Sequence, residues 1–226
     1  MNSFKKNILA ATVLISLTTV NVNRASAQMG EFGIRFMPTI SSLALKTSTG
    51  GAVSGKASIG FGAGVLLGFN FSQNVGLHAE VIYNTLSQKY TDTGMDRTIT
   101  LRYVNIPLLL SLNTGISKPV NLNVVVGPQI GLSVGSKLSS TTASDANTTQ
   151  AVLAVKKGDL GFAYGLGLDF GMNATGSIRF ALGYRGVIGL VDISDNSKTT
   201  TTDSFYVLDK THVKTYSGYA GITFLF

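Results

Sequence analysis

The chain has 226 residues, no cysteine and a formal net charge of +7; 44% of its residues are hydrophobic and only 13% are charged. The absence of cysteine excludes disulfide bonds and thiolate metal sites. The lysines are dispersed among Ser and Thr, which is typical of a solvated rim and does not predict a nucleic-acid-binding patch.

The first 27 residues have the pattern of a secretory signal peptide. Two lysines precede an apolar run over 8–20, and Ala25-Ser26-Ala27 supplies an A-x-A cleavage site before Gln28. The apolar run is shorter than the ~20 residues of a spanning helix, which disfavours a retained anchor. We expect residues 1–27 to be removed, leaving one barrel domain over 28–226 with 15 Lys and Arg against 11 Asp and Glu, a net charge of +4.

The mature chain alternates bulky apolar residues with small or polar ones. This period of two predicts strands with one face toward lipid and one toward a crowded lumen. The glycines of 57–77 share even positions; on a helix they would scatter around the axis, so a helical membrane protein is disfavoured. In chain order, the expected strands lie near 30–40, 59–71, 75–86, from 97 onward, and near 120–134, 160–172, 178–190 and 213–226.

The fourth strand breaks the alternation. Its first residues predict Ile99, Leu101 and Tyr103 toward lipid and Arg102 toward the lumen. The run that follows Tyr103 is apolar at almost every position, and Pro107 within it cannot donate to a ladder. We therefore expect a bulge or a phase switch beginning near Val104.

The connections are expected to be short and long in turn. Short turns fall at 71–75, 113–119 and 173–176, and longer loops at 41–58, 88–96, 137–157 and 194–212. Short periplasmic turns and long extracellular loops are the outer-membrane pattern, which predicts both termini in the periplasm. The two longest loops are rich in Ser and Thr without an apolar face, so we expect them to be mobile.

The run Tyr103-Val104-Asn105-Ile106-Pro107-Leu108-Leu109-Leu110 resembles the Tyr-Leu-Glu-Ile-Pro-Leu-Leu motif of PorT-like outer-membrane β-barrel proteins of Bacteroidetes. Asn105 stands where the motif usually has Glu. The resemblance covers nearly the whole mature chain and implies an outer-membrane barrel. PorT is implicated in protein secretion, whereas most relatives have no assigned activity, so the resemblance implies no activity here. Segments similar to the later strands are 127–131, 159–167 and 179–190.

The expected lumen collects four acids and four bases. In a barrel of about eight strands the side chains fill the interior, so we expect a salt-bridged plug; an ion or proton path and a catalytic carboxylate pair are the alternatives. Asp169 and Arg179 have the same parity on either side of one turn and are expected to pair directly. The expected network is Glu31, Arg35, Glu80, Arg102, Asp159, Asp169, Arg179 and Arg185.

No sequence motif predicts catalysis, a cofactor or a metal site. A nucleophilic site needs a base beside a hydroxyl, and the only histidines are His78 and His212, neither in a recognisable motif. The glycines near Gly165 belong to a strand, because no helix follows that could bind phosphate. We expect neither catalytic, cofactor-binding nor metal-ligating residues.

The sequence therefore predicts an all-β, up-and-down transmembrane β-barrel of about eight strands in a Gram-negative outer membrane, monomeric and non-enzymatic. Its expected role is structural or in surface interactions, with membrane lipid as a partner. A solute or lipid conduit, a component of a secretion system and a lipid-modifying enzyme are the alternatives. Ile222, Phe224 and Phe226 of the last strand resemble the signal read by the outer-membrane assembly machinery.

Overall fold

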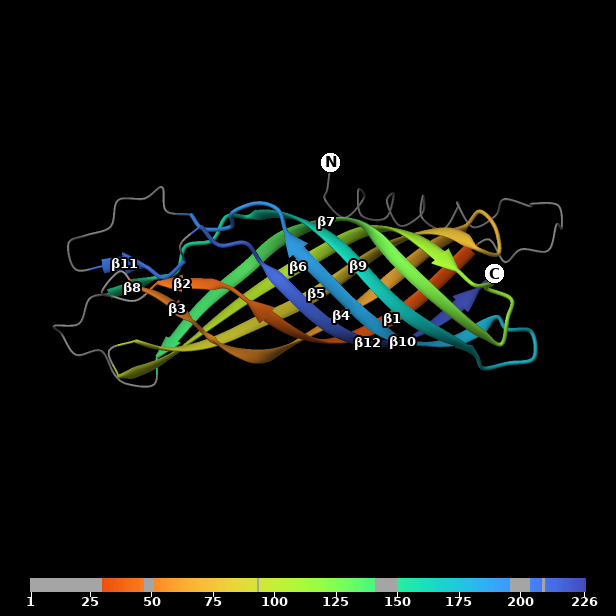
Figure 1. The fold of residues 1–226 in the computed structure, drawn as a ribbon, viewed down its shortest axis with the longest axis horizontal. Coiled ribbons are helices and arrows are strands. Elements are labelled where there is room, and N and C mark those ends of the chain that lie inside the picture. Colours follow the sequence, from red (N-terminus) through yellow and green to blue (C-terminus); the bar gives the residue numbers. More distant parts are fainter. Residues whose placement is uncertain (1–29, 47–50, 93, 141–149, 196–203, 209) are drawn as a thin grey trace, which may run out of the picture.

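The computed structural model describes residues 30–46, 51–92, 94–140, 150–195, 204–208 and 210–226. Their eight long strands form a closed barrel in the order β1-β12-β10-β9-β7-β6-β5-β4 (Figure 1), which confirms the predicted fold class. All neighbouring barrel strands are antiparallel, and β1 closes the ring by pairing with β12. The barrel strands are β1 (Gly30–Ser42), β4 (Lys56–Asn70), β5 (Val75–Asp92), β6 (Met95–Asn113), β7 (Val120–Ser140), β9 (Gly158–Gly171), β10 (Ile178–Gly189) and β12 (Lys214–Leu225).

The two ends of the barrel differ in their connections. The turn end carries the segments 71–74, 114–119 and 172–177, whereas the loop end carries 43–55, 93–94, 141–157 and 190–213. Two small sheets stand at the loop end (Figure 1): β2 (Ala44–Lys46) pairs with β3 (Ala52–Ser54), and β8 (Gln150–Val152) pairs in parallel with β11 (Ser204–Tyr206). No helix within the described ranges is long and apolar enough to cross a membrane.

Apolar side chains cover the outer wall next to the turn end. Along β1, for example, Ile34 is 56% exposed while its neighbour Arg35 is 6% exposed, as the alternation predicts. Phenylalanines such as Phe71 and Phe226 border this lipid-facing belt near the turn end. On β5 and β12 the last lipid-facing residues before the loop end are Tyr83 and Tyr216, where the amphipathic tyrosine ring suits a membrane interface.

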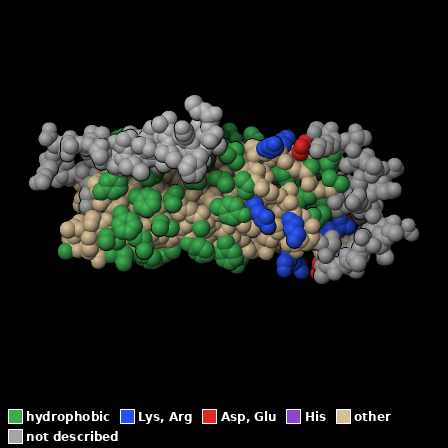
Figure 2. All heavy atoms as spheres, turned by 180° about the vertical axis from the view of Figure 1, so that it is seen from behind, with side chains coloured by type: hydrophobic (Ala, Val, Ile, Leu, Met, Phe, Trp, Pro, Cys, Tyr) green, Lys and Arg blue, Asp and Glu red, His purple; other side chains and the backbone are tan. Residues whose placement is uncertain are grey.

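On β5 and β6 the two faces of the wall exchange character toward the loop end, where the inner face becomes largely apolar and the outer face carries Thr, Ser, Lys and Arg. On β9 and β10 the outer face stays apolar there, as at Leu160 and Ile188. Figure 2 shows the same division, with most hydrophobic side chains over one half of the wall and Lys and Arg toward the loops. This is the arrangement of a water-soluble barrel, because a wall outside the membrane faces water instead of lipid.

The exchange corrects the prediction for the fourth strand. Ile99, Leu101 and Tyr103 are at most 1% exposed and face the interior of β6, while Arg102 is exposed on the outer wall. The sidedness of β6 never switches, because its odd residues stay inside as far as Ser111. The irregularity lies in β7 instead, where the register moves from Arg102↔Gly135 to Tyr103↔Ser133 and leaves an extra residue.

The connection expected at 88–96 is also wrong. β5 and β6 stay paired until Asp92↔Met95, and Gly94 with its φ of 77° occupies the turn, a conformation that glycine adopts without steric cost. The long loops do bury apolar side chains where they are described, among them Val207 and Leu208. The remaining parts of the two loops that were expected to be mobile lie outside the described residues. The signal peptide and its cleavage site also lie outside them.

Candidate functional site in the barrel lumen

A buried ionic layer crosses the middle of the lumen. Glu80 of β5 accepts two hydrogen bonds of 3.1 Å from Nη1 and Nη2 of Arg185 on β10. Arg35 of β1 brings its Nε to 3.5 Å from Glu80 Oε1. Its guanidinium also lies 4.6 Å from the ring centroid of Tyr219 on β12, a cation–π contact. One carboxylate of β5 thus joins a guanidinium group from β10, on the opposite side of the ring, and a second from β1, and every member is at most 6% exposed.

Small residues on the inner wall make room for this layer. A Cβ on Gly165 would lie 2.7 Å from the carbonyl oxygen of Tyr184 and 3.1 Å from Arg185 Nε. A Cβ on Gly64 would meet the carbonyl oxygen of Val81 and lie 2.7 Å from the Cα of Ile82. At these two lumen-side glycines the neighbouring strand and, at Gly165, the Arg185 side chain therefore occupy the space that a side chain would need.

A second polar layer lies at the turn end and holds Glu31. The carboxylate of Glu31 accepts a 2.7 Å hydrogen bond from Asn70 Nδ2 and lies 3.2 Å from His78 Nε2. His78 therefore pairs with Glu31 of β1 rather than with Glu80 on its own strand. All three side chains are buried, so this carboxylate is satisfied within the wall.

Asp169 and Arg179 meet at the same level but not as expected. Asp169 Oδ2 accepts hydrogen bonds from the side-chain amides of Asn121 and Asn123, at 3.0 and 2.7 Å. Arg179 donates to the backbone carbonyl of Asp169 at 3.0 Å and to the carbonyls of Ile116 and Lys118. Arg179 thus holds the turn between β6 and β7, and the expected direct pairing of the Asp169 and Arg179 side chains is wrong, because no described ion pair joins them.

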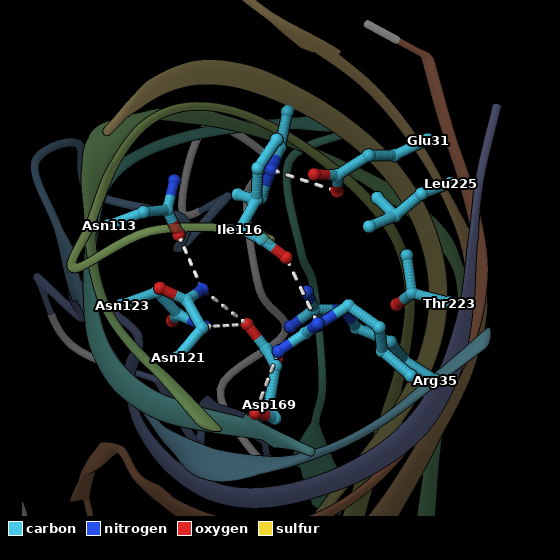
Figure 3. A pocket seen from close by; sticks show the side chains of 11 residues that line it. Glu31, Arg35, Asn113, Ile116, Asn121, Asn123, Asp169, Thr223 and Leu225 are labelled. Atoms are coloured by element: carbon cyan, nitrogen blue, oxygen red, sulfur yellow. Dashed lines mark hydrogen bonds and ion pairs between the residues drawn. The ribbon is translucent and has the colours of Figure 1, made fainter. Parts of the chain in front are cut away.

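Between these two layers lies a small polar cavity. Its volume is about 20 Å³, and Figure 3 shows the side chains of several strands converging on it. A water molecule needs about 10–15 Å³ of such space, so the cavity admits about one water molecule and no larger solute. The acidic and basic side chains that line it are those of Glu31, Arg35, His78, Asp169 and Arg179.

An apolar cluster fills the lumen at the loop end. Side chains from β5 and β6 pack there against residues of the described loop segments, such as Leu45, Ile193 and Leu208. Burial among these residues raises the pKa of the Tyr90 hydroxyl above its ordinary value. The cluster consists of Leu43, Leu45, Leu86, Tyr90, Ile99, Leu101, Tyr103, Ile193, Val207, Leu208 and Val213.

Two members of the predicted network lie elsewhere. Arg102 is on the outer wall, and Asp159 lies half-buried at the start of β9 without an arginine partner among the described ion pairs. The sequence reasoning left His78 and Asn70 out of the network. It also missed the ion pair of Arg97 with Asp92, 3.7 Å apart inside the loop-end extension. If the inward alternation of β5 and β6 had been continued beyond the lipid-facing belt, it would have placed both Arg97 and Asp92 inside the barrel.

The lumen shows no arrangement for catalysis in the part of the chain that the structure describes. Neither histidine lies in a hydrogen bond with a hydroxyl among the described contacts: His78 pairs with Glu31, and His212 is exposed. Nor do three or more His, Asp or Glu side chains in that part gather as a metal site. What the geometry provides is a rigid, charge-compensated interior.

Comparisons with known proteins agree with the fold. Residues 23–195 match the model of the outer membrane protein beta-barrel domain family. The outer-membrane protein OprG of Pseudomonas aeruginosa is 15% identical, with 88% of this chain and 96% of that chain covered and a TM-score of 0.52. Neisserial surface protein A is 14% identical, with coverages of 86% and 97% and a TM-score of 0.45. A search of curated protein sequences gave no match. The chain belongs to the outer membrane protein beta-barrel domain family.

Proposed function

We propose that this integral outer-membrane barrel is a non-enzymatic, non-conducting envelope protein whose loop end serves surface contacts. The observation that carries the proposal is the layer of Arg35, Glu80 and Arg185, which spans the lumen with all three charges buried. The apolar cluster closes the lumen a second time nearer the loops. On the turn-end side of the ionic layer, the cavity holds about one water molecule, which is too little space for a hydrated ion.

Recording in planar lipid bilayers tests this proposal. The purified, refolded protein is expected to give no single-channel steps at any applied voltage. A triple variant, Arg35→Ala, Glu80→Ala and Arg185→Ala, removes the ionic layer and serves as the test of whether the apolar cluster alone seals the lumen. Regular steps of constant conductance from the wild-type protein would contradict the proposal and favour the conduit.

We further propose that the loop end faces the outside of the cell and the turn end the periplasm, together with both termini of the barrel. The long connections at one end and the short turns at the other support this orientation. The chain has no cysteine, so single cysteines give clean labels. Thr91→Cys at the loop end should react with a membrane-impermeant maleimide in intact cells, whereas Thr175→Cys at the turn end should react only after lysis.

We also propose that this protein is related to the PorT-like barrels. The relation is supported by the motif around Pro107, which lies in the lipid-spanning part of β6, with Asn105 facing the lumen at the position usual for Glu. We also propose that the barrel is a monomer, because its closed ring leaves no strand edge to pair. The outward residues Ile222, Phe224 and Phe226 at the end of β12 are proposed as the signal for the assembly machinery.

A further inference from the structure

Four cations gather on the outer wall between the lipid-facing belt and the loops. Lys56 of β4, Lys89 of β5, Arg102 of β6 and Lys137 of β7 are all exposed, and they come from four strands that are consecutive in the ring. We call these four residues the cationic patch. In Figure 2, Lys and Arg side chains occupy this zone of the wall, next to the hydrophobic belt.

The register brings members of the patch close to one another. Lys56 and Lys89 are direct cross-strand partners, a position where like charges repel and destabilise a sheet. Lys137 pairs with Thr100, two residues from Arg102 on the same face of β6, so these two cations are diagonal neighbours about 7–8 Å apart. The strand pairing therefore brings these positive charges together on one part of the wall.

Among the described residues, no ion pair joins an acid to the patch; the ion pairs found there lie inside the barrel. The exposed acid nearest to the patch on this face is Asp96, a diagonal neighbour of Lys89 that accepts a 2.7 Å hydrogen bond from Thr91. Like-charged neighbours without acidic partners favour an external anion that several of them can share.

The position of the patch relative to the membrane indicates which kind of anion it could bind. Tyr83 is the last lipid-facing ring of β5, and Lys89 follows it by six residues, about 20 Å along the strand. On β6, Arg102 is the next outward residue beyond Val104 toward the loop end. The patch thus begins at Arg102, just beyond the lipid-facing belt, and extends along the outer wall past the level of the lipid headgroups toward Lys89.

We propose that the cationic patch binds the phosphate groups of a phosphorylated glycolipid of the outer leaflet, of the lipid A class. The inference rests on the proposed orientation, since only the outer leaflet carries this lipid. Lys56 and Lys89 share one phosphate, and Arg102 with Lys137 binds a second. Binding also removes the repulsion between the paired lysines, so the lipid stabilises this side of the barrel.

Titration in detergent micelles, followed by native mass spectrometry, tests the proposal independently of orientation. The probes are lipid A with two phosphates and the same lipid A after both phosphates are removed. The protein should retain the phosphorylated form and release the other. Near a membrane surface each Lys or Arg contributes about 1 kcal/mol, so Lys89→Gln should weaken the apparent affinity about fivefold, and Lys89→Arg should restore it.

Lys118→Gln is the matched control, because it removes the same charge from an exposed position at the turn end and should leave lipid A affinity unchanged. The Lys56→Gln, Lys89→Gln double variant removes both cations of one phosphate site and should weaken binding more than Lys89→Gln alone. Equal affinity for the phosphorylated and dephosphorylated lipids overturns the proposal, as does an equal loss from Lys118→Gln. Retention of a soluble sulfated oligosaccharide in place of lipid A would overturn it in favour of a polysaccharide partner. Labelling at Thr91 and Thr175 separates a failure of the orientation from a failure of the patch.

Discussion

Glu80 is the residue on which the middle of the barrel depends. Its carboxylate is 1% exposed and is the acid that both Arg35 and Arg185 contact. Removing the charge leaves two buried guanidinium groups without compensation, a change that typically costs about 3–5 kcal/mol. Glu80→Gln keeps the volume and is therefore expected to lower the free energy of unfolding by that amount, measured by urea titration of the protein in lipid vesicles.

Asp96→Asn is the control for Glu80→Gln. Asp96 is exposed on the outer wall, and surface substitutions usually change stability by less than about 0.5 kcal/mol. If both variants cost the same small amount, the ionic layer does not hold the walls together and the account given above for the lumen is wrong.

Glycines offer a second test at single positions. Gly64→Ala places a methyl group against the backbone of β5, where the carbonyl oxygen of Val81 cannot move aside. Gly218→Ala adds the same methyl where nothing lies within 4 Å. Overpacking typically costs about 1–3 kcal/mol, so Gly64→Ala should reduce the folded fraction in heat-modifiability gels while Gly218→Ala folds normally. The reverse order would show that the lumen near Gly64 is not filled.

At the scale of elements, β6 shows which part of the fold the sequence alone could predict. The alternation gave the correct faces wherever lipid covers the wall, as at Ile34 and Arg35, because lipid outside and packed polar groups inside produce unlike faces. At Leu101 the alternation is equally regular, but water replaces lipid outside, so the apolar face turns inward. Periodicity identifies two faces and does not say which solvent each one meets.

The same limit explains the candidate site. Glu80, Arg35 and Arg185 could be placed in the lumen because their strands cross lipid. Their pairing could not be predicted, because it depends on how strands far apart in sequence face each other across a closed ring. Asp169 and Arg179 are near in sequence, but the Asp169 carboxylate accepts its hydrogen bonds from Asn121 and Asn123 on the neighbouring strand and not from Arg179.

The inward position of Leu101 leads to a prediction for β6. Leu101 is 0% exposed and belongs to the apolar cluster, so Leu101→Ala should destabilise the barrel by about 2–5 kcal/mol. Thr100, its neighbour on the outer face, should tolerate Ala with less than about 0.5 kcal/mol. The free energy of unfolding of both variants can be measured by urea titration in vesicles. If Thr100→Ala lowers it strongly and Leu101→Ala does not, Leu101 faces lipid after all.

At the scale of the whole molecule, the barrel is closed by the seam between β1 and β12. Register pairs run from Glu31↔Leu225 to Ser42↔Lys214, and Phe226 extends the seam by exchanging two backbone hydrogen bonds with Gly30, at 2.9 and 3.0 Å. The Phe226 ring is 64% exposed. Because the backbone bonds do not need the ring, closure of the barrel in vitro should be nearly independent of this side chain.

Phe226→Ala therefore separates folding from assembly. Truncating a buried phenylalanine costs about 3–5 kcal/mol, and this exposed ring should cost much less, so the variant should refold in detergent micelles with nearly the wild-type yield. If Ile222, Phe224 and Phe226 are read by the assembly machinery, the same variant should insert poorly in cells and accumulate in the periplasm. Phe71→Ala is the control, because Phe71 is 60% exposed at the same end of the barrel but lies outside β12. Equal membrane yields for the two variants in cells would remove the assembly signal and leave the barrel itself unaffected, since the seam is held by its backbone pairs.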